Sequence, residues 1–475
     1  MSSHDSSARP APDQVLTDIA DYVNDYEITD SEAYRAARYC MIDALGCAIE
    51  ALSFPDCTKL LGPVVPGVIF PNGVRVPGTQ FELDPVTAAF NIGTTIRWLD
   101  FNDTFGGHPS DNLGGILAIA DYLSRKRKAE GGAPLVMRDV LTALIKAYEI
   151  QGVLTFENNF TRTVYDYVTL SKVAVTPVVT EMLGGRREEI VNAVSNAWAD
   201  GEHLRIYRQG TNTGSRKSWA AGDAMSRAVW LGLMAIRGEM GYPAVLTAKK
   251  WGYYDAFFNG QPFKFKQPYG SFVIQNSVFK FIPAGSQGQT AAECAFKMHP
   301  LVQHRLDDIE AIDITSHKRM MQIMDKQGPL TNPADRDHCV QYVVAVGLIH
   351  GKIETSYFDD DFAADPRIDG LRAKMTVVEE PSYTLGVYDP AKRSNPHAIE
   401  VRFRDGSKTP KIEVEYPLGH PSRRAEAVPM VEAKFRAHIA RRFPHKQQAA
   451  ILDLCMDQAR LEATPVNEFV ERFVI

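Results

Sequence analysis

The chain of 475 residues lacks several features that would assign a function at once. It has no apolar run near the roughly 20 residues that a membrane-spanning helix needs. Its 52 basic and 58 acidic residues give a formal charge of −6, so it shows no overall basic footprint for nucleic acid or an anionic membrane. Neither a membrane nor a nucleic acid is therefore expected as a partner.

Cysteine signatures and an apolar leader are missing as well. The six cysteines form no Cys-x-x-Cys pair, do not alternate with histidine at zinc spacing, and include no set that could hold an iron–sulfur cluster. Residues 1–13 are polar and contain proline, without the apolar core of a signal peptide. We expect a disordered tail on a cytoplasmic protein, with an organelle import signal as the less favoured alternative.

Helical periodicity dominates from residue 14 to about residue 260. Asp84-Pro85 is a typical helix start, because a carboxylate can cap the free N–H groups and proline fits the first helical position. A further pattern begins after the sequence His108-Pro109-Ser110-Asp111. Other stretches with the same periodicity lie at 138–153, 168–184, 187–199 and 222–238.

The pattern changes after residue 260. Segments 309–316 and 397–404 alternate apolar and polar residues as half-buried strands do, and Asp405-Gly406 is typical of a hairpin turn. We therefore predict a fold of class α plus α+β. A large all-helical domain is expected over 14–264, a smaller α+β domain over 265–420, and a helical segment over 421–475 that rejoins the first domain.

Two polar clusters could carry chemistry. In the cluster 97–112, Asp100 and Asp103 could act as bases, Thr104 could bind a carboxylate and His108 could transfer protons. The alternative interpretation of this cluster is two helix caps with solvated side chains. The cluster 207–219 places three cations among glycine and hydroxyl residues, which suits a polycarboxylate, although the bare pattern favours a solvated basic loop. Its cations are Arg208, Arg216 and Lys217.

A third polar stretch, 332–342, comes before an apolar run. Asp335 is expected to cap a helix there, and only Arg336 and Tyr342 suggest a function. In the late motif 416–424 a turn at a domain boundary is favoured over the edge of a site.

Several of these segments closely resemble the 2-methylcitrate dehydratase (MmgE/PrpD) family. The resemblance is carried by LDFNDT followed by GHPSDNLGGILA, by NTGSRKSWAAGDA and GEMGYP, and by NPADRDHCVQY and EYPLGHPSRR. It runs along nearly the whole chain from about residue 14. It implies a helical domain plus a smaller α/β domain, an active site between them, a homodimer, a small-molecule tricarboxylate substrate and no metal or organic cofactor.

The resemblance also implies roles for single residues. Five match positions of the family's active site, with Tyr342 as a cleft-lining tyrosine: Asp100, Thr104, His108, Lys217 and Tyr342. In this scheme His108 transfers protons, oriented by Asp100, and Thr104 is a hydrogen-bonding partner. The remaining side chains are expected to bind substrate: Arg208, Arg216, Asn212, Tyr167 and Gln287.

The chain departs from the family pattern in four places. The spacer between Thr104 and His108 is only Phe-Gly-Gly, where close relatives have a longer stretch, and Tyr167, Gln209 and Gln287 replace expected histidines. We read these changes, with the glycines at 106, 107, 285 and 288, as a site enlarged for a bulkier 2-alkylcitrate. The alternatives are a decarboxylase of a cis-aconitate-like acid and a non-catalytic paralogue that binds a tricarboxylate.

Overall fold

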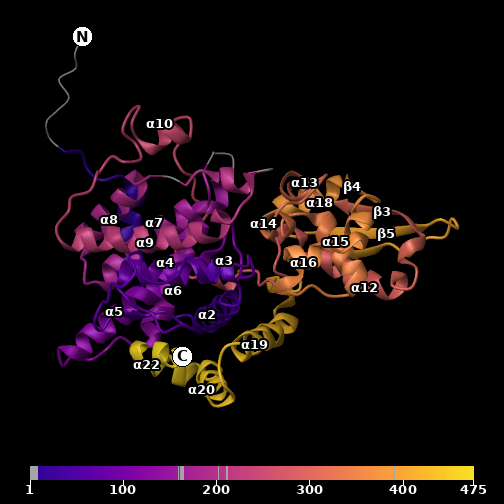
Figure 1. The fold of residues 1–475 in the computed structure, drawn as a ribbon. Helices are drawn as coiled ribbons and strands as arrows, with labels where there is room; N and C mark the ends of the chain where they lie inside the picture. Colours follow the sequence, from indigo (N-terminus) through magenta and orange to yellow (C-terminus); the bar gives the residue numbers. More distant parts are fainter. Residues whose placement is uncertain (1–8, 159, 161–164, 202, 210–211, 390) are drawn as a thin grey trace, which may run out of the picture.

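The computed structural model describes residues 9–158, 160, 165–201, 203–209, 212–389 and 391–475. Figure 1 shows a large helical domain beside a smaller domain that contains the sheet. This arrangement confirms the predicted fold class. Along these ranges, no helix is both long and apolar enough to cross a bilayer.

The helical domain is built from long helices that pack on one another around one large apolar core. Its helix starts follow the local sequence: the Asp84 side chain accepts hydrogen bonds from the N–H groups of Val86 and Thr87, and Asp30 accepts one from Glu32. Its principal helices are α1 (Gln14–Asp25), α2 (Ser31–Ala51), α4 (Pro85–Arg97), α5 (Leu113–Ala129), α6 (Met137–Glu157), α7 (Val168–Met182), α8 (Arg187–Ala199) and α9 (Arg216–Ile236).

Shorter elements connect these helices. They are α3 (Pro55–Thr58), β1 (Val74–Arg75), β2 (Glu82–Leu83), η1 (Pro109–Asn112), η3 (Arg205–Arg208), α10 (Tyr253–Phe257) and α11 (Phe272–Gln275). The apolar core of this domain includes Val273 and Phe279, which follow the boundary expected at residue 264. The separate core of the second domain begins at Ile282.

The second domain has a four-stranded sheet of order β4-β3-β5-β6. Strands β3 (Ile309–Ser316) and β5 (His397–Phe403) pair antiparallel and confirm the predicted alternation, and β6 (Ile412–Val414) pairs antiparallel to β5. Strand β4 (Met375–Glu379) pairs parallel to β3 and was not predicted. Helices α12 (Gln289–Val302) and α15 (Val340–His350) pack together, and α12 covers β5. The smaller helices are η5 (Ser286–Gly288), η6 (Leu306–Asp308), α13 (Lys318–Met324), α14 (Pro333–Arg336), η7 (Thr355–Phe358), α16 (Asp360–Ala363), α17 (Pro366–Arg372), α18 (Pro381–Tyr388) and η8 (Pro421–Arg423).

The C-terminal helices return to the first domain (Figure 1). Helix α19 (Arg424–Ala440) packs on α2, and α20 (His445–Cys455) packs on α19. The last two helices, α21 (Gln458–Ala463) and α22 (Val466–Glu471), contact α6 and α5. The chain therefore crosses between the domains twice, and both connecting segments lie at the junction between them (Figure 1).

Candidate active site

The loop between α4 and η1 carries Asp100 in an unusual backbone conformation. Its φ is +50°, in the left-handed region that a non-glycine residue rarely adopts. Such a conformation persists where the surroundings hold it, and it is frequent at functional sites. Downstream, the backbone of Thr104 exchanges two hydrogen bonds of 2.9 Å with Val278, which fastens the loop to the segment leading into the second domain.

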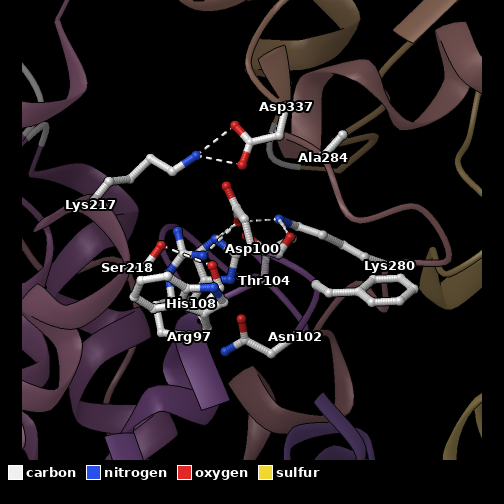
Figure 2. Close-up of polar contacts among 12 residues, drawn as sticks. Arg97, Asp100, Asn102, Thr104, His108, Lys217, Ser218, Lys280, Ala284 and Asp337 are labelled. Atoms are coloured by element: carbon white, nitrogen blue, oxygen red, sulfur yellow. Dashed lines mark hydrogen bonds and ion pairs between the residues drawn. The ribbon is translucent and has the colours of Figure 1, made fainter. Parts of the chain in front are cut away.

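The Asp100 carboxylate is buried among cations. Its Oδ1 lies 2.8 Å from an Arg97 guanidinium nitrogen, 2.5 Å from Lys280 Nζ and 3.1 Å from His108 Nε2. Lys280 also donates to the Asp100 carbonyl at 2.7 Å. Figure 2 shows Lys280 reaching Asp100 from one side and Arg97 and His108 from the other. Helix α4, the loop after it and the segment that leads into the second domain thus all contribute to the surroundings of one carboxylate.

A second carboxylate lies across the junction between the domains. Lys217, in the first turn of α9, donates to both oxygens of Asp337 at 2.5 and 2.6 Å. His338 links the two carboxylates, because its Nδ1 lies 2.5 Å from Asp337 Oδ1 and its Nε2 lies 3.3 Å from Asp100 Oδ2. The resulting cluster contains two carboxylates, three cations and two imidazoles.

Burial and charge set the protonation of this cluster. Burial alone would raise the pKa of Asp100, but Arg97 and Lys280 outweigh it and hold that pKa well below its ordinary value. Burial lowers the pKa of Lys280 to about 8 and the pKa of His338 to about 4. Burial, with Arg97 and Lys280 beside the ring, also lowers the pKa of His108 well below its usual range. Burial would raise the pKa of Asp337 as well, but Lys217 beside it holds that pKa below its ordinary value. Near neutral pH both imidazoles are therefore neutral and both carboxylates are charged.

Tyr167 lies beside Arg97 at the edge of the cluster. Arg97 Nε donates to the Tyr167 hydroxyl at 2.7 Å, and that hydroxyl donates to Asp111 at 3.2 Å. Arg208 lies over the Tyr167 ring, pairs with the buried Asp166 and donates to the Lys217 carbonyl at 2.9 Å. Tyr167 thus holds Arg97 in place, where the family resemblance predicted an imidazole.

A buried ammonium group joins the return helix to the site. Lys434 of α19 donates to Asp43 of α2 at 2.8 Å and to the carbonyl oxygens of Phe101 and Lys280 at 2.7 and 3.0 Å. Phe101 follows Asp100 in the loop, so this one side chain fixes the backbone beside two members of the cluster.

Comparisons with known proteins agree with this architecture. A family model described as the MmgE/PrpD N-terminal domain matches residues 17–266, and one described as the MmgE/PrpD C-terminal domain matches residues 282–458. The chain belongs to the MmgE/PrpD family.

Curated relatives match this family member along its whole length. A 2-methylcitrate dehydratase of Cupriavidus necator is 58% identical over 99% of both chains. Enzymes of the same name from Salmonella typhimurium and Escherichia coli are 55% and 54% identical, each over 100% of both chains.

Several site residues expected from the sequence lie together in the structure. Asp100, Thr104 and His108 share the loop, Lys217 faces it from α9, and Arg208 and Tyr167 adjoin it. The Thr104 hydroxyl donates to the Gly107 carbonyl at 2.7 Å, so in this structure it holds the short spacer in its turn. Gln287 is half-buried on η5.

Three other expected residues lie apart from the carboxylates. Arg216 is 41% exposed and pairs with Asp223 on its own helix. Asn212 is exposed, and Tyr342 is buried within the α+β core, where its hydroxyl donates to the Tyr357 carbonyl at 2.7 Å. Within the described residues, none of these three forms a hydrogen bond or ion pair with Asp100 or Asp337.

Four members of the cluster had no role predicted from the sequence: Arg97, Lys280, Asp337 and His338. Lys280 is a single charge in the apolar stretch 278–282, and that pattern is a usable signal for a buried functional lysine. In the stretch 332–342 the expected cap was wrong. Asn332 caps α14 by accepting from the Asp335 N–H at 3.0 Å, and Asp335 pairs with Lys326 instead.

The glycines do not open empty space, contrary to expectation. A Cβ on Gly107 would lie 2.6 Å from the Tyr167 ring, and one on Gly106 would lie 2.5 Å from Thr155 Oγ1. A Cβ on Gly285 or Gly288 would meet Met324 at 2.9 or 2.8 Å. Tyr167 and Met324 therefore occupy the volume that these glycines release.

The same cluster contains three side chains of the kinds that bind metal ions. Ligand atoms of Asp100, Asp337 and His338 all lie within 4.8 Å of one another. However, the ammonium groups of Lys280 and Lys217 already lie 2.5 Å from these two carboxylates, where they would repel a metal ion. We therefore assign the carboxylates to ion pairs.

Proposed function

We propose that this chain is a hydro-lyase that eliminates water from 2-methylcitrate or another 2-alkylcitrate and gives an aconitate-type tricarboxylate. The observation that carries the proposal is the charge of the cluster at the domain junction. The cluster holds three positive charges, on Arg97, Lys217 and Lys280. It holds only two negative charges, on the carboxylates of Asp100 and Asp337. A buried excess of positive charge suits a substrate with three carboxylates, and the names of the curated relatives point to the same substrate class.

The chemistry requires two proton movements. A base removes a weakly acidic proton from the carbon next to a carboxylate, the C–H electrons form the double bond, and the C–O bond breaks as the hydroxyl accepts a proton and leaves as water. His108, oriented by Asp100, is our candidate for one of these transfers. Lys217 and Lys280 would stabilise the negative charge that develops on the substrate carboxylate.

A bulkier 2-substituent remains part of the proposal. Support comes from the short Phe105-Gly106-Gly107 spacer and from Met324, an unbranched side chain that can repack around a ligand. The glycines themselves give no support, since their space is filled.

The decisive experiment is a mass-spectrometric assay of the purified protein without added metal. 2-Methylcitrate and a long-chain 2-alkylcitrate are supplied separately, and both loss of water and release of carbon dioxide are followed. We expect loss of one water, abolished in His108→Ala. Release of carbon dioxide would favour a decarboxylase, and tricarboxylate binding without turnover would favour a binding protein. A rate with 2-methylcitrate equal to that with the longer chain would refute the bulkier-substrate part.

A homodimer is also part of this proposal. The loop between α3 and β1 exposes a run of apolar side chains, with Val64 at 84% and Ile69 at 83% exposure. Exposed apolar groups of this kind are typical of surfaces that a partner covers. Light scattering on the purified chain should give twice the monomer mass, and Ile69→Glu should shift it towards the monomer. A monomer at micromolar concentration would contradict this assignment.

A further inference from the structure

Elimination of water needs a proton acceptor and a proton donor on different substrate atoms, and the sequence supplied only one imidazole for these tasks. Tyr167, Gln209 and Gln287 stand where further histidines were expected. The structure brings a different histidine, His338 of the α+β domain, into the cluster.

We propose that His338 is a second catalytic residue of this enzyme, the base that removes the carbon-bound proton, and that Asp337 positions it. The inference rests on the proposed dehydratase function and adds a residue to its mechanism.

The hydrogen bonds favour one tautomer of His338. Lys217 Nζ is 3.1 Å from Nδ1, but it already donates to both Asp337 oxygens and to the Ala334 carbonyl. Asp337 Oδ1 is closer, at 2.5 Å, and can only accept while Asp337 is ionised. The Nδ1 proton therefore points to Asp337, and Nε2 carries a free lone pair. A carboxylate that fixes the tautomer of a catalytic imidazole in this way also stabilises its protonated form.

The position of His338 suits contact with a substrate. Its side chain is 16% exposed, whereas those of Asp100, Lys217 and Lys280 are 2%, 1% and 0% exposed. A ligand that enters the junction can reach the His338 ring more easily than the buried charges behind it. Gly285 lies beside this ring, since its Cβ position is only 3.4 Å from His338 Nε2.

Charge explains how a weakly basic imidazole can act here. Burial and the Lys217 ammonium keep His338 neutral in the free protein, so Nε2 is ready to accept a proton. A bound tricarboxylate brings negative charge to the same cluster and favours the imidazolium. Asp100 Oδ2, 3.3 Å from Nε2, becomes the acceptor for the new N–H group.

The proton balance closes through Asp100. Nε2 accepts the proton from carbon, the C–H electron pair forms the double bond, and the C–O bond breaks. The leaving hydroxyl takes a proton from the His108 imidazolium, which forms when the negative tricarboxylate binds beside it and which contacts Asp100 Oδ1. His338 then passes its new proton across Asp100 to His108, because the two Asp100 oxygens face the two imidazoles, and the starting protonation is restored.

The test compares His338→Gln with His304→Gln, which changes an exposed histidine of the same domain. Glutamine keeps hydrogen-bonding capacity but cannot take up a proton. We expect kcat of His338→Gln to fall by roughly 100-fold to 10,000-fold, with KM changed by no more than about threefold, while His304→Gln behaves like the wild type. A kcat for His338→Gln within about threefold of wild type would overturn the proposal.

A second variant separates chemistry from folding. In His338→Ala, added imidazole should restore part of kcat, and the restored rate should follow the concentration of the neutral imidazole base. If the variant unfolds at a lower temperature and imidazole restores nothing, His338 is structural and the proposal fails. Wild-type protein that dehydrates none of the substrates would instead defeat the proposed function itself, so the two failures are distinguishable.

Discussion

Lys434→Met is the most informative test of how the C-terminal helices support the site. Methionine keeps most of the side-chain length but removes the ammonium group that α19 gives to Asp43, Phe101 and Lys280. The Asp43 carboxylate, 0% exposed, then loses its 2.8 Å partner. A buried charge left unpaired is strongly destabilising.

Protonation of Asp43 limits the cost. Burial already raises the pKa of Asp43 in the wild type, despite the opposing effect of Lys434. Without the lysine, the folded variant can bind a proton there. Protonating an aspartate of ordinary pKa about 3.9 at pH 7 costs about 4 kcal/mol, at 1.36 kcal/mol per pH unit. We therefore expect the free energy of unfolding to fall by up to about 4 kcal/mol at pH 7.

The sign of the pH dependence provides the check. In the variant the folded pKa of Asp43 lies above the unfolded value, so the folded state binds more protons and gains stability as pH falls. The deficit relative to wild type should shrink by about 3 kcal/mol between pH 7 and pH 5, at 1.36 kcal/mol per pH unit. Urea unfolding at both pH values measures it, and Lys434→Met/Asp43→Asn should recover much of the loss at pH 7. A deficit below about 1 kcal/mol at pH 7, or one that does not change with pH, would refute the reasoning.

Three further predictions concern the site. Gly107→Ala should lower the melting temperature and kcat, because the φ of Gly107 is +143° and the new Cβ would lie 2.6 Å from the Tyr167 ring. An unchanged melting temperature would contradict this packing of Gly107 against Tyr167. Burial lowers the pKa of Lys280 to about 8. Because Lys280 loses its positive charge as pH rises through about 8, kcat/KM should fall over that range. Lys280→Arg should remove this decline from the pH profile, since arginine stays charged. Prolonged dialysis against EDTA should leave kcat and the melting temperature unchanged, because ammonium groups neutralise the carboxylates of Asp100 and Asp337; activity restored only by a divalent metal would contradict the ion-pair assignment.

Local sequence determined much of the fold. The Asp84 cap, the alternation in 309–316 and the Asp405-Gly406 turn each depend on residues within one turn or one strand, and each has the predicted form. By contrast, β4 was missed because its residues Met375–Glu379 are partly exposed and do not alternate clearly. Its strand conformation depends on pairing with β3, which lies more than fifty residues earlier.

The residues of the candidate site also form two groups: those that the local sequence indicated and those that only tertiary packing brings together. Asp100, Thr104 and His108 lie within nine residues, so their sequence pattern by itself indicated a shared loop. Lys280, Asp337 and Lys434 lie far apart along the chain and resemble ordinary buried or capping residues when read alone. Only the packing of the two domains and the return of α19 place them around Asp100 and Asp43, because a buried carboxylate needs cations at hydrogen-bonding distance and that distance is set in three dimensions.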